Sequence, residues 1–358
     1  MSNSQIGIAK GGITVELIKN EIFTQASALA QTKELLLKCR QELTHYLHQP
    51  YRRFIFLGCG SGYMLSSGAA AMFSLHTDKK AVAFAGGEVM VNPAKYADIF
   101  TGALVIVCSR SGETSEVAIS LLELKKLTDF KTLGILAKEE STLKSMMDFS
   151  LEIPWAFDES VCQTRNISNF YYALTMLCAF YNGDETLEES FSSYIKEQTE
   201  YLSKIEPDCK KIAGLGWNNV TILADGEIYG IASEGGLAFT EISILPGDCF
   251  HLLDYRHGPI VLANPQKLII ALLNPTEKKH QKQMISDLRK RGSYVITLGP
   301  GGQDFWDSDY HVSLDSILRY EVWGLALVNL CQVLAFHKAL ACGHDPDIPE
   351  GLNPFVKL

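Results

Sequence analysis

The segment with the clearest chemical content is a hydroxyl-rich turn, Ser109-Arg-Ser-Gly-Glu-Thr114. It follows the apolar run Leu104–Cys108 and precedes an amphipathic stretch that begins near Ser115. A buried strand that leads into a helix leaves unpaired backbone N–H groups and the positive end of the helix dipole at such a turn. Phosphate groups bind at helix N-termini of this kind.

The side chains of this turn add to the case for an anion. Ser109, Ser111 and Thr114 supply hydroxyl groups around one point, and Gly112 allows the backbone to approach a phosphoryl oxygen closely. We therefore predict a phosphate site. The alternative is an ordinary serine-rich helix N-cap, where Ser and Thr are favoured anyway. The pattern is not G-x-x-x-x-G-K-[ST], which disfavours a Walker loop for nucleotide triphosphates.

A second glycine-rich turn, Gly58-Cys-Gly-Ser-Gly62, follows the apolar run that begins at Phe54. It resembles the start of the dinucleotide fingerprint G-x-G-x-x-G, but Leu65 stands where the third glycine belongs. A dinucleotide-dependent oxidoreductase is therefore a weak alternative. Loops at the carboxyl ends of neighbouring parallel strands converge, so we expect Ser61 to face the same ligand as the first turn.

The second half of the chain offers acid–base groups. Glu234 and Glu241 lie on one face of an expected helix, about two turns apart. A carboxylate can move a proton between C1 and C2 of an open-chain sugar phosphate if burial raises its pKa, and the apolar neighbours Phe239 and Ile242 suit Glu241 to that role. The alternative is a solvated or salt-bridged helix glutamate.

A histidine lies in the unusual segment Arg256-His-Gly-Pro259. His257 can carry a proton near neutral pH, which the opening of a sugar ring requires, although a lone histidine is more often structural. No cluster of His, Cys and carboxylate residues shows the sequence spacing of metal ligands. We expect no metal and no other cofactor.

The elements that must position these residues follow from periodicity. Helices are expected over 14–32 and 33–48, and from Arg53 onwards short β-branched runs alternate with longer amphipathic stretches, which predicts βαβ units and parallel sheets. The expected strands are 54–57, 81–85, 104–107, 132–136, 221–224, 249–251, 268–273 and 295–298. The expected helices between them are 63–73, 92–96, 115–126, 169–181, 230–245, 276–291 and 320–340.

A polar, charge-rich stretch divides this alternation in two. We predict an α/β protein with two tandem domains, each a parallel-sheet α-β-α sandwich of the flavodoxin-like or Rossmann-like type, preceded by N-terminal helical arms. The predicted parts are a helical segment 1–50, a phosphate-binding domain 51–182, a helical connector 183–207, a carboxylate-bearing domain 208–345 and a tail 346–358.

An internal repeat supports this division. Laying the segment from Phe54 on the segment from Val220 aligns Leu57 with Leu223, Gly60 with Gly226 and Tyr63 with Tyr229. Such a match indicates duplication of a strand, a glycine turn and a helix.

Composition limits the possible partners. The formal net charge is −9 and the basic residues are scattered, so we expect no nucleic-acid partner. The nine cysteines include no C-x-x-C pair and lie mostly in apolar runs, which indicates a reducing, cytoplasmic location. The N-terminus lacks a signal pattern, and the most apolar helix candidate, 322–340, carries polar residues such as Asn329 and Lys338. We expect no membrane span.

Taken together, these segments resemble the double SIS (sugar isomerase) domain family. That family is typified by the isomerase half of glucosamine-6-phosphate synthase, by amino-sugar-phosphate deaminases and by fructosamine-phosphate deglycases. The resemblance covers about residues 21–358, and the matching segments occur in order at 58–61, 109–114, 159–165, 233–237, 256–259 and 346–352.

The resemblance implies roles for individual residues. The residues that would bind the phosphate and nearby sugar oxygens are Ser61, Ser109, Arg110, Ser111 and Thr114. Those that would contact the sugar chain are Val161 and Gln163. Glu241 would be the C1/C2 base, Glu234 would support the site, and His257 would assist ring opening from the second subunit of a homodimer. The tail would lie over this shared active site, whose substrate would be a phosphorylated sugar or amino sugar.

Two departures from the family matter. Ala238 and Pro354 stand where the synthase has lysines, and Lys357 is out of register. The glutaminase domain of the synthase is also expected to be absent. We therefore expect deamination or isomerisation of an amino-sugar 6-phosphate, or deglycation of a fructosamine 6-phosphate. A simple aldose–ketose phosphosugar isomerase and a non-catalytic phosphosugar-binding sensor remain alternatives.

Overall fold

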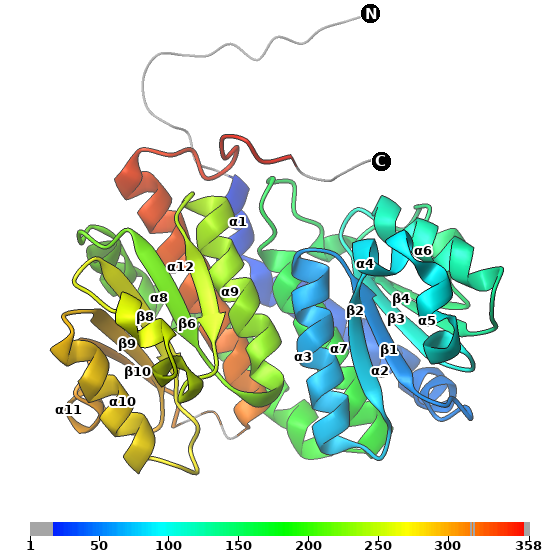
Figure 1. Ribbon diagram of the computed structural model, residues 1–358, viewed down its shortest axis with the longest axis horizontal. Coiled ribbons are helices and arrows are strands. Elements are labelled where there is room, and N and C mark those ends of the chain that lie inside the picture. The colour runs from blue at the N-terminus through cyan, green and yellow to red at the C-terminus, as the bar shows by residue number, and fades with distance from the viewer. Residues whose placement is uncertain (1–16, 316, 318, 354–358) are drawn as a thin grey trace, which may run out of the picture.

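The chain forms two lobes, each built on a five-stranded parallel sheet (Figure 1). This computed structural model describes residues 17–315, 317 and 319–353. The predicted α/β class with parallel sheets is thereby confirmed.

The first sheet has the strand order β2-β1-β3-β4-β5. Every residue of β1 and β3 is buried, because helices cover both faces of the sheet. Its strands are β1 (Phe54–Gly58), β2 (Ala81–Ala85), β3 (Leu104–Ser109), β4 (Lys131–Leu136) and β5 (Phe149–Glu152). The helices of this lobe are α3 (Ser61–His76), α4 (Gly86–Val91), α5 (Pro93–Phe100), α6 (Ser115–Lys125) and α7 (Arg165–Asn182), with 3₁₀ turns at Lys144–Met146 and Pro154–Ala156.

The second sheet has the order β10-β9-β8-β6-β7, which is the order of the first sheet when read from β7. Its strands are β6 (Asn219–Leu223), β7 (Gly247–Phe250), β8 (Lys267–Leu272), β9 (Tyr294–Gly299) and β10 (Tyr310–Ser313). The helices of this lobe are α9 (Tyr229–Ile242), α10 (Lys279–Lys290), α11 (Gln303–Trp306) and α12 (Tyr320–Cys342). Its 3₁₀ turns are Gly226–Ile228, Asp254–Arg256 and Pro259–Leu262.

Three further helices lie outside the two alternating series: α1 (Leu17–Phe23), α2 (Gln25–Leu47) and α8 (Glu185–Ala213). Helix α2 packs on α7, and α8 packs on α12. Helix α12 is long and apolar enough to cross a membrane by composition, but 83% of its apolar window is buried inside the protein. Its hydropathy is therefore explained by a position in the core.

Buried polar groups connect the N-terminal helices to both lobes. Gln25 of α2 donates from Nε2 to Gln332 Oε1 of α12 at 3.1 Å, and Asn329 of α12 donates to Gln25 Oε1 at 3.1 Å. The hydroxyl of Ser168 on α7 donates to the same Gln25 oxygen at 2.5 Å. The polar side chains of α12 thus have hydrogen-bond partners in the interior, as buried polar groups require.

Helices α3 and α9 join the lobes (Figure 1). They cross where Gly68 of α3 meets Gly230 of α9, and a Cβ atom on Gly230 would clash with the backbone nitrogen of Gly68 and the carbonyl oxygen of Met64. The two helices are therefore in direct backbone contact, which only glycine permits at this point.

Some predicted boundaries were wrong. The first helical break lies at Thr24 rather than between residues 32 and 33, and α8 continues past Pro207 to Ala213. Strands β5 and β10 were not predicted. Both are short edge strands with mixed burial, so they lack the continuous β-branched run that marks a central strand.

The glycine contact between α3 and α9 predicts a stability effect. Gly230→Ala should destabilise the protein by about 1–3 kcal/mol, because the added methyl group overpacks a backbone contact. Gly87→Ala is the matched control, since a Cβ at this helical glycine meets no atom within 4 Å, and it should be neutral or slightly stabilising. Urea denaturation of both variants checks this. Equal stability of Gly230→Ala and the wild type would contradict the packing described.

Candidate active site

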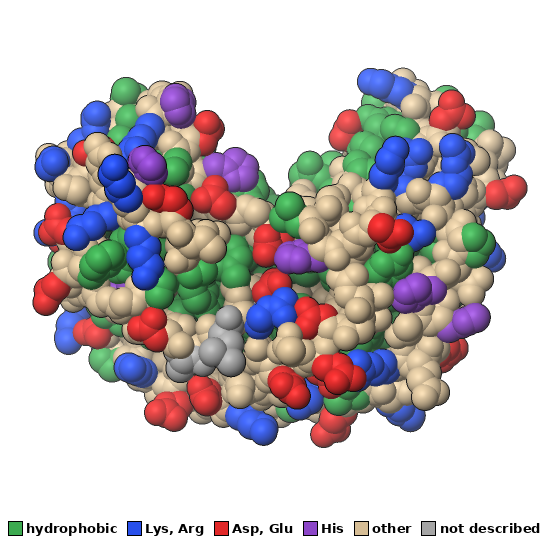
Figure 2. Space-filling model, turned by 90° about the horizontal axis from the view of Figure 1, so that it is seen from below, with side chains coloured by type: hydrophobic (Ala, Val, Ile, Leu, Met, Phe, Trp, Pro, Cys, Tyr) green, Lys and Arg blue, Asp and Glu red, His purple; other side chains and the backbone are tan. Residues whose placement is uncertain are grey.

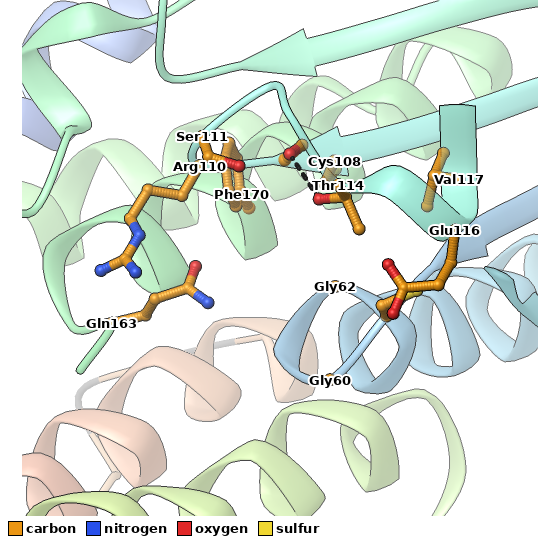
Figure 3. A pocket seen from close by; sticks show the side chains of 12 residues that line it. Gly60, Gly62, Cys108, Arg110, Ser111, Thr114, Glu116, Val117, Gln163 and Phe170 are labelled. Carbon is orange, nitrogen blue, oxygen red and sulfur yellow. Dashed lines mark hydrogen bonds between the residues drawn. The ribbon is translucent and has the colours of Figure 1, made fainter. Parts of the chain in front are cut away.

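A polar cavity of about 190 Å³ lies at the carboxyl ends of β1 and β3. These strands are neighbours in the sheet, so the turns that follow them meet at one edge, as predicted. Gly60 and Gly62 line the cavity from one turn, and the residues that line it from the other are Ser109, Arg110, Ser111 and Thr114 (Figure 3).

The hydroxyl-rich turn is held by its own side chains. Ser109 Oγ accepts a hydrogen bond from the Gly112 N–H at 3.0 Å and lies 3.2 Å from Thr114 Oγ1. Ser111 Oγ accepts from the Glu113 N–H at 3.1 Å. Gly112 has φ 64°, a conformation that favours glycine. The turn at the start of α6 is therefore held in shape by its own hydrogen bonds.

Arg110 has a position that its sequence context did not predict. Its Nη1 donates to the carbonyl oxygens of Ser160 at 2.9 Å and Val161 at 3.0 Å, and the residue is buried. These two hydrogen bonds link the hydroxyl-rich turn to the segment that carries Gln163. Figure 3 shows Arg110 and Gln163 at one end of the cavity.

Two buried carboxylates hold the segment that contains Gln163. Glu21 of α1 accepts hydrogen bonds from the backbone N–H and the hydroxyl of Ser160. Asp158 accepts from the Thr164 N–H at 2.8 Å. Burial and the nearby Glu21 raise the pKa of Asp158. The segment is thus fixed from α1 on one side and from Arg110 on the other.

Gln163 and Val161 differ in their positions. Gln163 lines the cavity, and its Oε1 accepts from Asn166 Nδ2 at 2.6 Å. Val161 does not line it; its backbone N–H faces the carbonyl oxygen of Asp347 at 3.5 Å. The first residues of the predicted tail therefore lie beside this segment. Pro354 and Lys357 lie outside the described residues.

Ser61 and Glu234 meet across the two lobes. Ser61 begins α3 and is buried, and its hydroxyl lies beside the Glu234 carboxylate of α9, where it lowers the pKa of that group. Burial and the nearby Glu241 act in the opposite direction and raise the pKa of Glu234 well above its usual range. Glu234 is therefore a buried carboxylic acid that favours its neutral form.

Glu241 lies further along α9 in a half-buried position. Burial raises its pKa, and the positive charge of Arg110 opposes that effect. Glu241 itself does not line the cavity, but Arg110, whose charge acts on it, does. A carboxylate with a raised pKa is the kind of group that general-base catalysis near neutral pH requires.

His257 does not join this group within one chain. It is exposed, at the turn between two 3₁₀ segments, and it does not line the cavity. The preceding Arg256 is anchored to Asp287 of α10 at 3.3 Å. A contribution of His257 from a partner subunit remains a prediction.

Other residues that line the cavity, among them Cys59, Glu116 and Phe170, were not assigned a role from the sequence. The Glu116 carboxylate lies at the end of the cavity opposite Gln163 (Figure 3). Its position in the first turn of α6 is where acidic residues commonly stabilise helix dipoles, so sequence alone gives it no special signal.

Residues 47–182 match the family model described as the SIS domain. A glutamine–fructose-6-phosphate aminotransferase [isomerizing] from Pyrococcus horikoshii is 24% identical over 363 residues, which cover 98% of this chain and 58% of that protein. The enzyme of the same name from Buchnera aphidicola is 26% identical over 267 residues, which cover 71% and 43%. The chain thus spans about half the length of the curated relatives that it matches.

Solved structures share the fold over nearly the whole chain. Glucosamine-6-phosphate deaminase from Thermotoga maritima has a TM-score of 0.79 and 26% identity, covering 95% of this chain and 99% of its own. Tagatose-6-phosphate ketose/aldose isomerase from Escherichia coli has a TM-score of 0.82 and 19% identity, covering 97% and 98%. The second likeness concerns the fold alone.

The raised pKa of Glu234 predicts a pH-dependent stability difference. The folded state holds the Glu234 proton more tightly than the unfolded state, so this stabilisation is lost as pH rises through the folded-state pKa. Glu234→Gln should therefore raise Tm relative to the wild type more at about pH 8 than at about pH 4. Thermal melts at both pH values check this, with the exposed Glu34→Gln as control. An equal Tm difference at both pH values would contradict it.

Proposed function

We propose that this protein, whose residues 47–182 form an SIS domain as the sequence resemblance predicted, is a phosphosugar enzyme. Its reaction would be deamination or isomerisation of an amino-sugar 6-phosphate, or deglycation of a fructosamine 6-phosphate. The observation that carries the proposal is the hydroxyl-rich start of α6 in one lobe together with Glu234 and Glu241 on α9 of the other, which Ser61 and Arg110 of the first lobe adjoin.

The hydroxyl-rich turn at the start of α6 supports a phosphorylated substrate. An acidic protein of net charge −9 attracts anions only through local groups. The hydroxyls of Ser109, Ser111 and Thr114 and the N–H groups at the start of α6 are such groups. They suit the phosphate ester of a sugar whose carbon chain extends toward α9.

The carboxylates supply the proton transfer. In an amino-sugar 6-phosphate, Glu241 would remove the proton from C2 of the open chain and return it to C1, through an enolamine. The resulting imine at C2 would react with water to give ammonia and a ketose phosphate. In a fructosamine phosphate the proton would move from C1 to C2, and hydrolysis at C1 would release the amine and an aldose phosphate. Neutral Glu234 would stabilise the oxygen or nitrogen at which charge develops.

Ala238 supports loss of an amine over amide-dependent synthesis. It is buried on α9 where the synthase has a lysine, so this helix offers no amine there. The main alternative is a simple aldose–ketose isomerase, which would use the same base. A non-catalytic sensor would bind the phosphosugar without turnover.

Loss of the proposed base predicts loss of turnover. Glu241→Gln should lower kcat by about 100- to 10,000-fold, because the amide cannot accept the proton. Thr240→Ala, at the exposed neighbouring position of α9, is the matched control and should retain activity. The measurement is turnover of a panel of amino-sugar, fructosamine and hexose 6-phosphates, followed by mass spectrometry and an ammonia assay. Undiminished turnover by Glu241→Gln would exclude this residue as the base.

A homodimer would complete the site with His257. The surface beside this histidine is apolar: Val261 is 72% exposed and Leu262 is 56% exposed, as expected for a patch that a partner covers. In a two-fold dimer, His257 of each chain would lie beside Glu241 of the other chain. Dimers that mix two different variants can therefore test whether His257 acts from the partner.

Mixed dimers test this arrangement. Refolding equal amounts of Glu241→Gln and His257→Ala chains together should restore about one quarter of wild-type activity, since half of the dimers are mixed and each contains one intact site. Each variant alone should be nearly inactive. If His257 acts within its own chain, or has no role in catalysis, the mixture will be no more active than the average of the two separate variants.

A further inference from the structure

A second group of ionisable side chains lies at the end of α3 opposite Ser61. His76 ends α3 in the first lobe, Glu227 lies in the 3₁₀ turn Gly226–Ile228 of the second lobe, and Glu321 lies in the first turn of α12. Figure 2 shows acidic, basic and histidine side chains gathered where the two lobes meet on this face. Since α3 spans roughly 24 Å, this group is remote from the cavity described above.

The spacing of these side chains matches a metal site. His76 Nε2 lies 3.4 Å from Glu227 Oε1 and 3.9 Å from Glu321 Oε1, and the three candidate ligand atoms all lie within 4.8 Å of one another. Ligands bound tetrahedrally to zinc at about 2.0–2.2 Å stand roughly 3.4 Å apart. We propose that His76, Glu227 and Glu321 bind a divalent transition-metal ion of the Zn²⁺ type.

Charge favours a divalent cation here. Glu227 is 8% exposed and Glu321 is 4% exposed, so both carboxylates are largely removed from water. Arg319 donates to Glu321 at 2.7 Å and to Asp184 at 3.0 Å. Three carboxylates and one guanidinium, with neutral His76, leave a net charge of minus two. A divalent ion neutralises this charge.

A neighbouring arginine holds one of the proposed ligands, and a cavity adjoins the group. Arg319 orients the Glu321 carboxylate, as outer hydrogen bonds do at metal sites. A cavity of about 290 Å³ adjoins the group, and His76, Glu321 and Asp184 line it. It leaves room for a water molecule as the fourth ligand of a tetrahedral ion. The ligands come from distant parts of the chain, which is why sequence spacing alone indicated no metal.

The structure also shows what competes with the ion. A proton on His76 is favoured by its hydrogen bond to Glu227, which raises the pKa of the imidazole, while burial and Arg319 oppose this. Only neutral imidazole binds a metal, so protons compete with the ion for His76. The ion would link α3 of the first lobe to two elements of the second, and it should therefore raise the melting temperature.

The test is titration of the metal-free, full-length protein with Zn²⁺ by calorimetry, together with thermal melts. We expect saturable one-to-one binding, an increase in Tm, and affinity at least about tenfold weaker in His76→Ala and in Glu227→Gln. His280→Ala is the matched control, because His280 faces a single carboxylate, Glu277, at 3.0 Å on the exposed surface of α10. It should leave the affinity unchanged.

Three results would overturn the proposal. The first is the absence of saturable Zn²⁺ binding. The second is a Zn²⁺ affinity equal to that of the wild type in whichever of His76→Ala and Glu227→Gln remains folded by circular dichroism. The third is a loss of Zn²⁺ affinity in His280→Ala as large as that in the ligand variants. The test requires no sugar substrate, so its outcome is separate from that of the proposed function.

Discussion

Helices α3 and α9 touch backbone to backbone, and this contact holds the two lobes together at close range. Each helix follows the first strand of its own sheet, and the two cross at Gly68 and Gly230 with no side chain between them. This close approach brings the start of α3 to the buried face of α9, so that Ser61 meets Glu234. Bulkier residues at the crossing would separate the hydroxyl-rich turn from the carboxylates.

The buried carboxylates Glu234 and Glu227, at the two ends of this helix pair, have opposite pKa shifts. Near the start of α3, burial leaves Glu234 without a compensating cation of its own and raises its pKa, which keeps a proton available beside Glu241. At the other end of α3, Glu227 and Glu321 are equally buried but face His76 and Arg319, and the pKa of Glu227 is lowered despite its burial. The first environment suits proton transfer, and the second suits binding of a cation.

Local patterns predicted much of the fold and part of the site. The turns at Gly58–Gly62 and Ser109–Thr114 were predicted to converge, because apolar runs identify central strands and parallel strands end at one edge. The edge strands β5 and β10 carry no such run. The anchoring of Arg110 to the segment after Asp158, the buried support from Glu21 and the His76 group all join distant residues, and no spacing along the chain indicates them.

If one ligand spans the hydroxyl-rich turn and the α9 carboxylates, a crystal structure of the protein soaked with hexose and amino-hexose 6-phosphates will show it. We expect a phosphate within hydrogen-bond distance of Ser109, Ser111 and Thr114, with C1 and C2 of the sugar facing Glu241. A phosphate bound elsewhere, or a sugar chain directed away from α9 in the assembled oligomer, would contradict it.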